Sequence, residues 1–331
     1  MAAGRAFALL AFLLACSPLQ QTAIQGPTRL IVTPDDGSLP LFALLRRAEY
    51  SIDVVAYLLS SQEVLEELAA AQRRGVRVRV LLEQEPVGGG ESNREAAQWL
   101  TAAGVTVRWA DPAFRFTHAK IILVDGMRAA IMTLNLTASS FQSNREFAAI
   151  VEDPSLVHAL IELFESDWER MPPPALDLPL VISPGNARRE LQGLIVSARQ
   201  SLEIYVLSLE DDSIAAALAA AADRGVRVRI ITNPPMGSDG YADERALVRT
   251  HGGFIGFLEY PNIHAKVVIV DGARAFVGSQ NFTATSLDQN REVGILIADP
   301  AVLQRLQRTF ESDWSQVTLE TLLPQVLAIA A

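Results

Sequence analysis

The order of apolar and polar positions along this chain predicts the same set of strands and helices twice. Short apolar, β-branched runs have the composition of buried strands, and the Ala-, Leu- and Glu-rich stretches after them have the length of helices. We predict a strand, a helix and a second strand at 51–58, 62–74 and 76–82, and again at 201–207, 212–224 and 226–232. Strands that alternate with helices predict the α/β class, with mixed sheets flanked by helices.

The two sets belong to an internal repeat. The sequence HAKIILVDG at 118–126 recurs as HAKVVIVDG at 264–272, and the sequence NRE at 144–146 recurs at 290–292. A third sequence, FESDW, occurs at 164–168 and again from Phe310 to Trp314.

The repeat fixes the expected domain organisation. The prolines after Met171 cannot continue a helix, so they mark the boundary between the copies. We predict two similar βα-repeat domains at 27–172 and 178–318 and a tail at 319–331, which we expect to dock on the core. Two such copies would pack as a pseudo-twofold dimer with one active site at the interface, so the chain would function as a monomer.

Composition and charge narrow the class of protein. The chain has 331 residues, of which 50% are hydrophobic and 20% are charged, as expected for a globular protein with a large core. The formal net charge is −10, which disfavours bulk nucleic acid as the natural partner, because nucleic-acid-binding proteins usually carry a basic surface.

The first residues have the pattern of a signal peptide. Arg5 precedes an apolar run from Ala6 to Ala15 that is too short to span a bilayer. The run ends at Cys16, the only cysteine, in a sequence that resembles a bacterial lipobox. We expect residues 1–15 to be removed and Cys16 to be lipidated, which would anchor the protein outside the cytoplasm at a bacterial membrane, in the periplasm or at the cell surface. The alternative is an ordinary signal peptide and a secreted protein.

The repeated histidines and lysines are the candidate catalytic residues. In a strand, side chains two residues apart share a face, so His118 would lie beside Lys120. The chain contains only two lysines, Lys120 and Lys266, and uses arginine at every other basic position apart from histidine. This placement indicates a need for a compact ammonium group at both sites. No group of histidines or cysteines has the spacing of metal ligands, so neither a metal nor another cofactor is predicted.

The second copy resembles the signature of the phospholipase D superfamily. The matching positions are His264, Lys266, Asp271, Gly278, Ser279 and Asn281. The first copy keeps His118, Lys120, Asp125 and Asn135. It departs from the pattern at Met132 and Thr133, which replace glycine and serine.

We interpret the two aspartates as structural groups. Asp125-Gly126 and Asp271-Gly272 each have the sequence of a tight hairpin turn.

The chemistry requires a nucleophile, an acid for the leaving alkoxide, and positive charge around the phosphoryl oxygens. Two histidines that face each other across a pseudo-twofold axis can supply the first two. The resemblance implies a phosphohistidine formed on His118, with His264 as general acid and then base. The groups expected to bind the phosphoryl oxygens are Lys120, Lys266, Asn135 and Asn281, supported by Thr133 and Ser279.

The resemblance also implies that Glu146 and Glu292 orient the histidines through a ring N–H. The alternative is that these glutamates form ion pairs with the neighbouring Arg145 and Arg291. The remaining histidines, His158 and His251, are interpreted as incidental. The alternating arginines at 77, 79, 227 and 229 are predicted to form the exposed face of two strands.

The expected activity is that of a phospholipase D, a phosphodiester hydrolase or transphosphatidylase acting on phospholipid headgroups at a membrane. We expect an apolar rim for the lipid, formed by Phe114, Phe116, Phe141, Leu258, Tyr260 and Leu287. One alternative is an exported, metal-independent nuclease of the same superfamily. Another is a non-catalytic, membrane-anchored protein that binds phosphate, which the departure at Met132 and Thr133 would favour.

Overall fold

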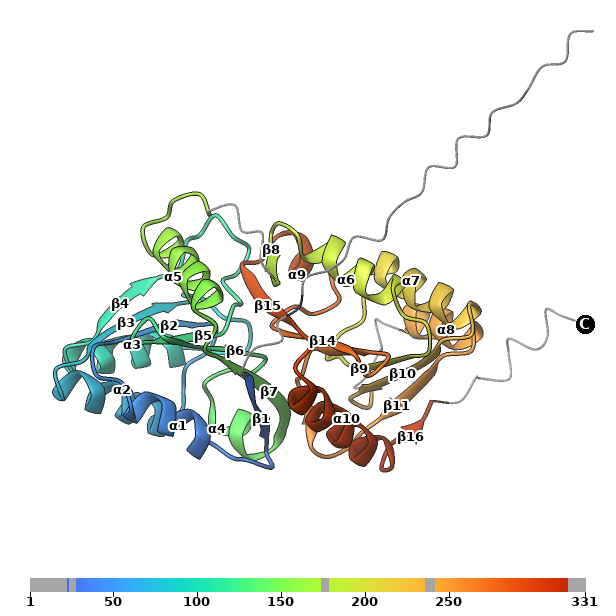
Figure 1. Ribbon diagram of the computed structural model, residues 1–331. Coiled ribbons are helices and arrows are strands. Elements are labelled where there is room, and N and C mark those ends of the chain that lie inside the picture. The colour runs from blue at the N-terminus through green and yellow to red at the C-terminus, as the bar shows by residue number, and fades with distance from the viewer. Residues whose placement is uncertain (1–22, 24–27, 174–178, 236–241, 321–331) are drawn as a thin grey trace, which may run out of the picture.

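The computed structural model describes residue 23 and residues 28–173, 179–235 and 242–320. They form two α/β halves, each with its own mixed sheet and flanking helices (Figure 1). The predicted signal peptide, Cys16 and most of the tail at 319–331 lie outside the described residues. In the part of the chain that is described, no helix is both long and apolar enough to cross a bilayer.

The first half, repeat 1, contains one sheet and five helices among its described residues. The strands of the sheet are β1 (Thr28–Thr33), β2 (Ser51–Ala56), β3 (Arg77–Leu82), β4 (Thr106–Trp109), β5 (Ile121–Val124), β6 (Arg128–Met132) and β7 (Asn144–Val151). The helices are α1 (Leu39–Arg46), α2 (Gln62–Arg73), α3 (Ser92–Ala102), α4 (Ala138–Gln142) and α5 (Pro154–Trp168). The strand order is β1-β7-β6-β5-β2-β3-β4, with β2, β3 and β4 parallel.

The second half, repeat 2, has the same plan. Its strands are β8 (Leu180–Ser183), β9 (Ser201–Tyr205), β10 (Arg227–Thr232), β11 (Phe254–Phe257), β12 (Asn262–Ile263), β13 (Val267–Val270), β14 (Arg274–Gly278), β15 (Glu292–Ile297) and β16 (Thr318–Leu319). Its helices are α6 (Ala187–Val196), α7 (Asp212–Asp223), α8 (Ala242–Thr250), α9 (Ala284–Asp288) and α10 (Pro300–Trp314). Strand β12 crosses to repeat 1 and pairs with β7, so the sheets meet at the boundary between the halves.

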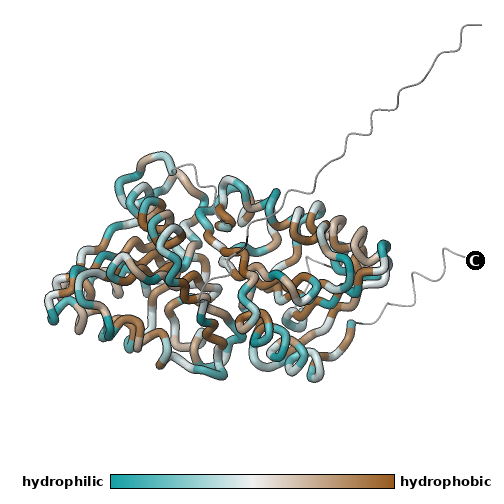
Figure 2. Tube along the Cα trace, in the orientation of Figure 1, coloured by the Kyte–Doolittle hydropathy of each residue, from teal (hydrophilic) through white to brown (hydrophobic). Residues whose placement is uncertain are grey.

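The layers show how the two halves are related. In Figure 1, α1, α2 and α3 lie below the sheet of repeat 1 and α5 lies above it, whereas α6, α7 and α8 lie above the sheet of repeat 2 and α10 lies below. Each set of three helices covers a core of its own half. A third core contains α5, α10 and strand residues of both halves, and Figure 2 shows hydrophobic positions gathered in the inner strands. This shared core joins the repeats into the expected pseudo-twofold arrangement.

The hydrophobic pattern located the repeated elements within a few residues. The helix predicted at 62–74 is α2, and the helix predicted at 212–224 is α7. The first strand of each set ends earlier than predicted, at Ala56 and Tyr205.

The prediction that all four alternating arginines are exposed was wrong for Arg79 and Arg229. The side chain of Arg79 is 11% exposed and is covered by α5. Arg229 is 8% exposed and is covered by α10. The Arg79 guanidinium lies 4.8 Å from the ring centroid of Phe164 and forms ion pairs with Asp53 and Glu165.

The aspartates of the repeated motif are structural, as expected. Asp125 and Gly126 both have positive φ values, as the two central residues of a type I′ hairpin turn require. The Asp125 carboxylate accepts backbone N–H groups of residues 49 to 51 at the start of β2. Asp271 accepts the equivalent groups of residues 199 to 201 in repeat 2. Each aspartate therefore fixes the hairpin that follows the histidine and lysine to the neighbouring strand.

Candidate active site

The His-x-Lys segments lie immediately before strands rather than within them, which corrects the sequence-based placement. Strand β5 begins at Ile121, after Lys120, and β13 begins at Val267, after Lys266. The backbone before β5 pairs with the other repeat instead. The N–H groups of His118 and Ala119 both donate to the carbonyl oxygen of Arg291, at 2.8 and 2.9 Å. Repeat 2 therefore holds the His-x-Lys segment of repeat 1 in position.

Each histidine is bonded to a glutamate of the other repeat. Nδ1 of His118 lies 2.8 Å from Oε2 of Glu292, and Nδ1 of His264 lies 2.9 Å from Oε2 of Glu146. The predicted orienting role is thus supported by geometry, with partners exchanged between the repeats. An ionised carboxylate can only accept, so Nδ1 carries the ring proton and Nε2 keeps its lone pair for chemistry.

Burial favours the neutral form of both histidines. Desolvation lowers the pKa of His118 to about 4, against the opposing attraction of Glu292 and with a smaller contribution from Lys120. Desolvation likewise lowers the pKa of His264, although Glu146 acts in the opposite direction. Neutral imidazole is the nucleophilic form, so both rings can act as nucleophile or base near neutral pH.

The two lysines are the buried cations of the site. Lys120 is 1% exposed and Lys266 is 0% exposed, and each Nζ donates to the carbonyl oxygen of the histidine two residues earlier. Desolvation lowers the pKa of Lys120 to about 7 and that of Lys266 to about 8. The field of Glu292 acts on both ammonium groups and opposes this shift. A bound phosphate anion would provide the negative charge that favours the protonated form of these buried lysines.

The glutamates are themselves fixed by buried polar groups. Glu146 accepts hydrogen bonds from the hydroxyls of Thr133 and Ser140, at 2.9 and 3.0 Å. Glu292 accepts from Ser286 and from the amide of Asn290. Desolvation raises the pKa of each carboxyl, but the facing histidine and the other partners outweigh it and hold the pKa below its usual value.

The hydroxyls of Thr133 and Ser279, which we expect to support phosphate binding, form hydrogen bonds with protein groups. Both residues are fully buried behind the site. Thr133 donates to Glu146 and accepts the N–H of Phe147, and Ser279 makes its hydrogen bonds with the backbone of Val293. Their side chains anchor β6 and β14 to the neighbouring strands, and Thr133 also fixes Glu146.

The predicted asparagines follow β6 and β14 and have unused hydrogen-bonding capacity. The Oδ1 atoms of Asn135 and Asn281 are buried without a hydrogen-bond partner among the described residues. Buried polar atoms are rarely left in this state, so both amides are candidates to contact a ligand.

The departure at Met132 lies outside the reacting centre. In repeat 2, a Cβ at Gly278 would come within 2.6 Å of the ring of Phe276. The position equivalent to Phe276 in repeat 1 is Ala130, and Met132 is fully buried in the core that α1, α2 and α3 cover. The methionine side chain therefore occupies volume that an aromatic ring occupies in repeat 2.

Arg145 and Arg291 pair across the repeats, but not with the glutamates beside them. Arg145 forms a two-armed ion pair with Asp313 and a further pair with Asp35. Arg291 pairs with Asp167. The arginine of each NRE sequence thus pairs with the aspartate of the FESDW sequence in the other repeat. This excludes the alternative that Glu146 and Glu292 form ion pairs with the neighbouring arginines.

Sequence reasoning missed Tyr57, which makes the two sides of the site unequal. Its ring lies edge-on to His118 with centroids 4.5 Å apart, and Nζ of Lys120 lies 5.1 Å from its centroid. The equivalent position in repeat 2 is Leu207. A comparison of the two copies at this position would have revealed the asymmetry.

Only part of the expected apolar rim is accessible. Phe141, Leu258 and Leu287 are buried in the core. Phe114 and Phe116 are half-buried, and Tyr260 is 60% exposed. The two histidines interpreted as incidental lie away from the site: His158 is in α5 beside Glu162, and His251 pairs with Asp223.

The comparisons with known proteins agree with this arrangement. A family model described as "Cardiolipin synthase, PLD-like domain" matches residues 41–168 and 191–314. The chain therefore belongs to the phospholipase D superfamily.

Individual relatives include lipid enzymes of two kinds. Cardiolipin synthase of Geobacillus kaustophilus is 26% identical over 345 residues, which is 90% of this chain and 68% of the relative. Mitochondrial cardiolipin hydrolase of Xenopus laevis is 31% identical over 157 residues, or 47% of this chain and 70% of the relative. The chain spans about two thirds of the length of the bacterial cardiolipin synthases that head the comparison.

The fold has a counterpart among solved structures. Phosphatidylserine synthase of Haemophilus influenzae superposes with a TM-score of 0.67 at 13% identity, covering 88% of this chain and 87% of the other. Two mixed-sheet halves with flanking helices are therefore shared at the level of fold.

Proposed function

We propose that this protein transfers the phosphatidyl group of a phospholipid from its headgroup to water or to an alcohol, through a phosphohistidine. The observation that carries the proposal is the pair of exchanged His–Glu contacts, 2.8 and 2.9 Å long, together with the two buried lysines. The site supplies a nucleophile, an acid–base group and positive charge, which are the elements that phosphodiester displacement requires.

In the first step, Nε2 of His118 attacks phosphorus and the bond to the headgroup oxygen breaks. His264, protonated as the substrate anion binds beside it, donates its proton to the leaving alkoxide. The low pKa of His118, about 4, and its contact with Tyr57 support its assignment as the nucleophile. Lys120 and Lys266 stabilise the charge that develops on the phosphoryl oxygens.

In the second step, neutral His264 removes a proton from water or an alcohol. The resulting oxygen nucleophile attacks phosphorus, and the bond to Nε2 of His118 breaks. Water yields phosphatidic acid, and an alcohol yields a new phosphodiester. Glu292 and Glu146 keep both rings in the tautomer that each step needs and stabilise the imidazolium form.

Phospholipid is the substrate class that the surroundings of the site favour. Phe114, Phe116 and Tyr260 provide accessible aromatic surface, and such rings are suited to the membrane interface. Relatives named cardiolipin synthase and cardiolipin hydrolase lend support to a lipid substrate. Lipidation at Cys16 would hold the site at an extracytoplasmic membrane surface.

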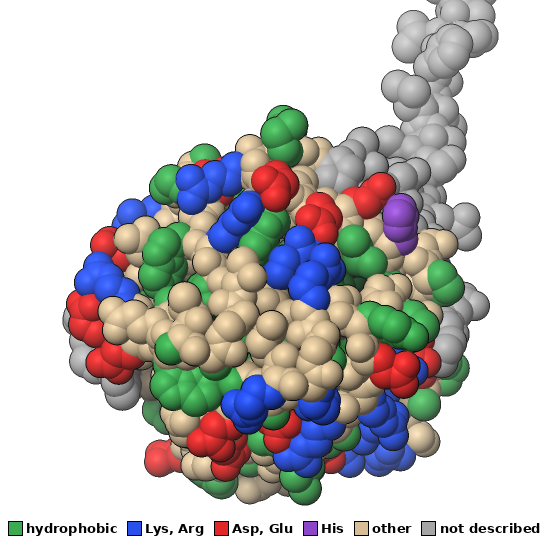
Figure 3. All heavy atoms as spheres, turned by 90° about the vertical axis from the view of Figure 1, so that its left-hand side faces the viewer, with side chains coloured by type: hydrophobic (Ala, Val, Ile, Leu, Met, Phe, Trp, Pro, Cys, Tyr) green, Lys and Arg blue, Asp and Glu red, His purple; other side chains and the backbone are tan. Residues whose placement is uncertain are grey.

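The nuclease alternative has less support. Arg79 and Arg229 are covered by helices and paired with acidic groups, so they do not offer free positive charge to a nucleic acid. On the face of the molecule seen in Figure 3, basic and acidic side chains are interspersed rather than segregated into a basic track.

The test is a comparison of products. The mature protein is incubated with chelator and either mixed phospholipid vesicles or plasmid DNA, beside a His264→Ala variant. We expect headgroup release from the vesicles, which the variant lacks, and intact plasmid. Plasmid nicking without headgroup release would support the nuclease instead. Absence of both activities would support a non-catalytic protein that binds phosphate.

A further inference from the structure

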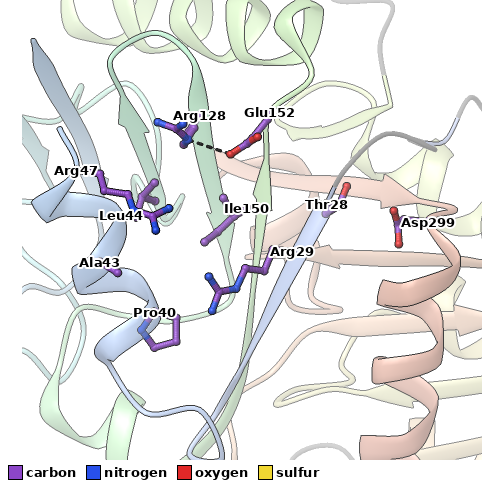
Figure 4. A pocket seen from close by; sticks show the side chains of 10 residues that line it. All are labelled: Thr28, Arg29, Pro40, Ala43, Leu44, Arg47, Arg128, Ile150, Glu152 and Asp299. Carbon is purple, nitrogen blue, oxygen red and sulfur yellow. Dashed lines mark hydrogen bonds and ion pairs between the residues drawn. The ribbon is translucent and has the colours of Figure 1, made fainter. Parts of the chain in front are cut away.

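A cavity of about 260 Å³ opens in repeat 1 at a distance from the catalytic centre. It lies between α1 and the outer ends of β1, β6 and β7, and Figure 4 shows the residues that line it. Glu146 is near one end of β7, whereas Ile150 and Glu152 of the cavity are near the other. Glu152, which directly follows β7, is six positions after Glu146, and this corresponds to about 20 Å of extended chain. The cavity is therefore distinct from the histidine and lysine site.

Three arginines surround an apolar floor in this cavity. Leu44 and Ile150 are buried at its base, and in Figure 4 the side chains of Arg29, Arg47 and Arg128 are arranged around them. Arg29 is in β1, Arg47 caps the C-terminus of α1 and Arg128 is in β6. The folded chain therefore brings them together from distant positions.

Two of the three guanidinium groups have no acidic partner in the part of the chain that the structure describes. Arg128 pairs with Glu152 at 2.9 Å. Arg29 and Arg47 are exposed and make no ion pair or side-chain hydrogen bond among the described residues. The other acidic residue of the lining, Asp299, caps α10 by accepting the N–H groups of residues 301 and 302. The cavity thus has an excess of uncommitted positive charge.

Repeat 2 lacks this cluster, although its fold is the same. Arg274 is the equivalent of Arg128, and it donates to the hydroxyl of Ser197 at 2.7 Å. Ser197 stands where repeat 1 has Arg47, and a proline at 179 stands where repeat 1 has Arg29. The fold does not need these two arginines, so their presence in repeat 1 calls for another explanation.

We propose that this cavity is a second phosphate-binding site, which takes the phosphate group of a small ester or of a phospholipid headgroup. Guanidinium groups bind phosphate oxygens in a two-armed geometry that suits a cluster of arginines. The apolar floor would contact a glycerol or similar carbon skeleton. The volume accommodates a headgroup but not acyl chains, so a lipid would remain in its bilayer and present only its headgroup. The site would hold the protein on anionic lipid, or sense a soluble phosphate ester, independently of turnover.

The test compares the wild-type protein with an Arg29→Thr/Arg47→Ser variant, in which the serine copies repeat 2. The control is Arg73→Ser, which removes an exposed charge from α2, away from the cavity. Equilibrium dialysis with glycerol 3-phosphate counts bound ester per chain. Cosedimentation measures binding to vesicles of phosphatidylcholine with or without phosphatidylglycerol. The single variant Arg47→Ser serves if the double variant does not fold.

Loss of one of two glycerol 3-phosphate sites in the double variant would assign a soluble ester. Binding to phosphatidylglycerol vesicles that falls about 10- to 100-fold in the double variant, without a second soluble site, would assign the lipid headgroup. Headgroup-release activity on soluble short-chain lipid should be unchanged, which separates this site from the catalytic one. Equal binding by the wild type and the double variant in both assays, or an equal loss in Arg73→Ser, would overturn the proposal.

Discussion

The carboxylate of Glu292, in repeat 2, lies 2.8 Å from Nδ1 of His118, in repeat 1. The reciprocal contact joins Glu146 to His264. Each of the two histidine rings therefore contacts a carboxylate of the repeat to which it does not belong. In the proposed mechanism, both copies of the motif contribute to one site.

Removal of either orienting carboxylate should lower turnover. In Glu292→Gln, the amide can still occupy the volume, but it cannot stabilise the imidazolium of His118 or fix one tautomer. We expect kcat to fall about 10- to 100-fold with little change in KM, as for other groups that orient a reactive histidine. Initial rates of headgroup release measure this effect, with the exposed Glu63→Gln as control. A variant that keeps half of the wild-type kcat would contradict the orienting role.

Activity should decline on the alkaline side because the lysines lose their charge. Desolvation lowers the pKa of Lys120 to about 7 and that of Lys266 to about 8. As pH rises through this range in the free enzyme, the ammonium groups that attract phosphate become neutral. We expect kcat/KM to fall from pH about 7 upward, and the fall to begin at higher pH in Lys120→Arg if that variant is active. A flat profile up to pH about 10 would show that the lysines keep their protons.

Removal of one partner of an exchanged ion pair should be strongly destabilising, because it leaves the other charge buried. Arg145→Met would leave Asp313 buried and unpaired, which costs about 3–5 kcal/mol of unfolding free energy. The double variant Arg145→Met/Asp313→Asn should recover part of this loss, because the asparagine oxygen can still accept from Tyr205. Urea unfolding measures both variants. Arg46→Met, on the exposed Arg46–Glu67 pair, is the control and should have a much smaller effect, because solvent screens exposed ion pairs. Equal, small effects at both sites would contradict the account.

Met132 should contribute to packing rather than to catalysis. Met132→Gly removes a fully buried side chain, and Ala130 cannot fill the space, so we expect a loss of about 2–5 kcal/mol. Ala130→Phe/Met132→Gly imitates repeat 2 and should be more stable than the single variant. Thermal unfolding and the kcat of the folded fraction measure the two effects. A kcat in the double variant that differs more than about tenfold from the wild type would place Met132 in the catalytic machinery.

Much of the fold could be predicted because the repeat supplied two versions of each pattern. The α/β class, the two halves and the hairpin at Asp125 followed from periodicity and turn chemistry. The burial of Arg79 did not, because an alternating strand pattern gives no information about a helix that later covers its polar face. Only the packing of α5, with Phe164 and Glu165, decides that this arginine is enclosed.

The sequence predicted which histidines, lysines and glutamates form the candidate site, but not which glutamate contacts which histidine. Two identical copies cannot reveal whether a glutamate contacts its own histidine or the other one, because both choices have the same residues and spacing. The exchange depends on how the sheets meet, with the N–H of His118 bonded to the carbonyl of Arg291. The hydrogen bond from Thr133 to Glu146 was likewise not predicted from the sequence.

The central claim is that His118 forms a covalent intermediate with the phosphatidyl group at a site completed by His264. The most direct measurement is the intact mass of His264→Ala after brief incubation with phosphatidyl-p-nitrophenol. This leaving group needs no acid, so His118 can still attack, whereas release of the phosphatidyl group requires the missing base. We predict an increase of one phosphatidyl group per chain, mapped to His118 and absent from His118→Ala. No adduct in His264→Ala, or an adduct that persists in His118→Ala, would contradict the mechanism.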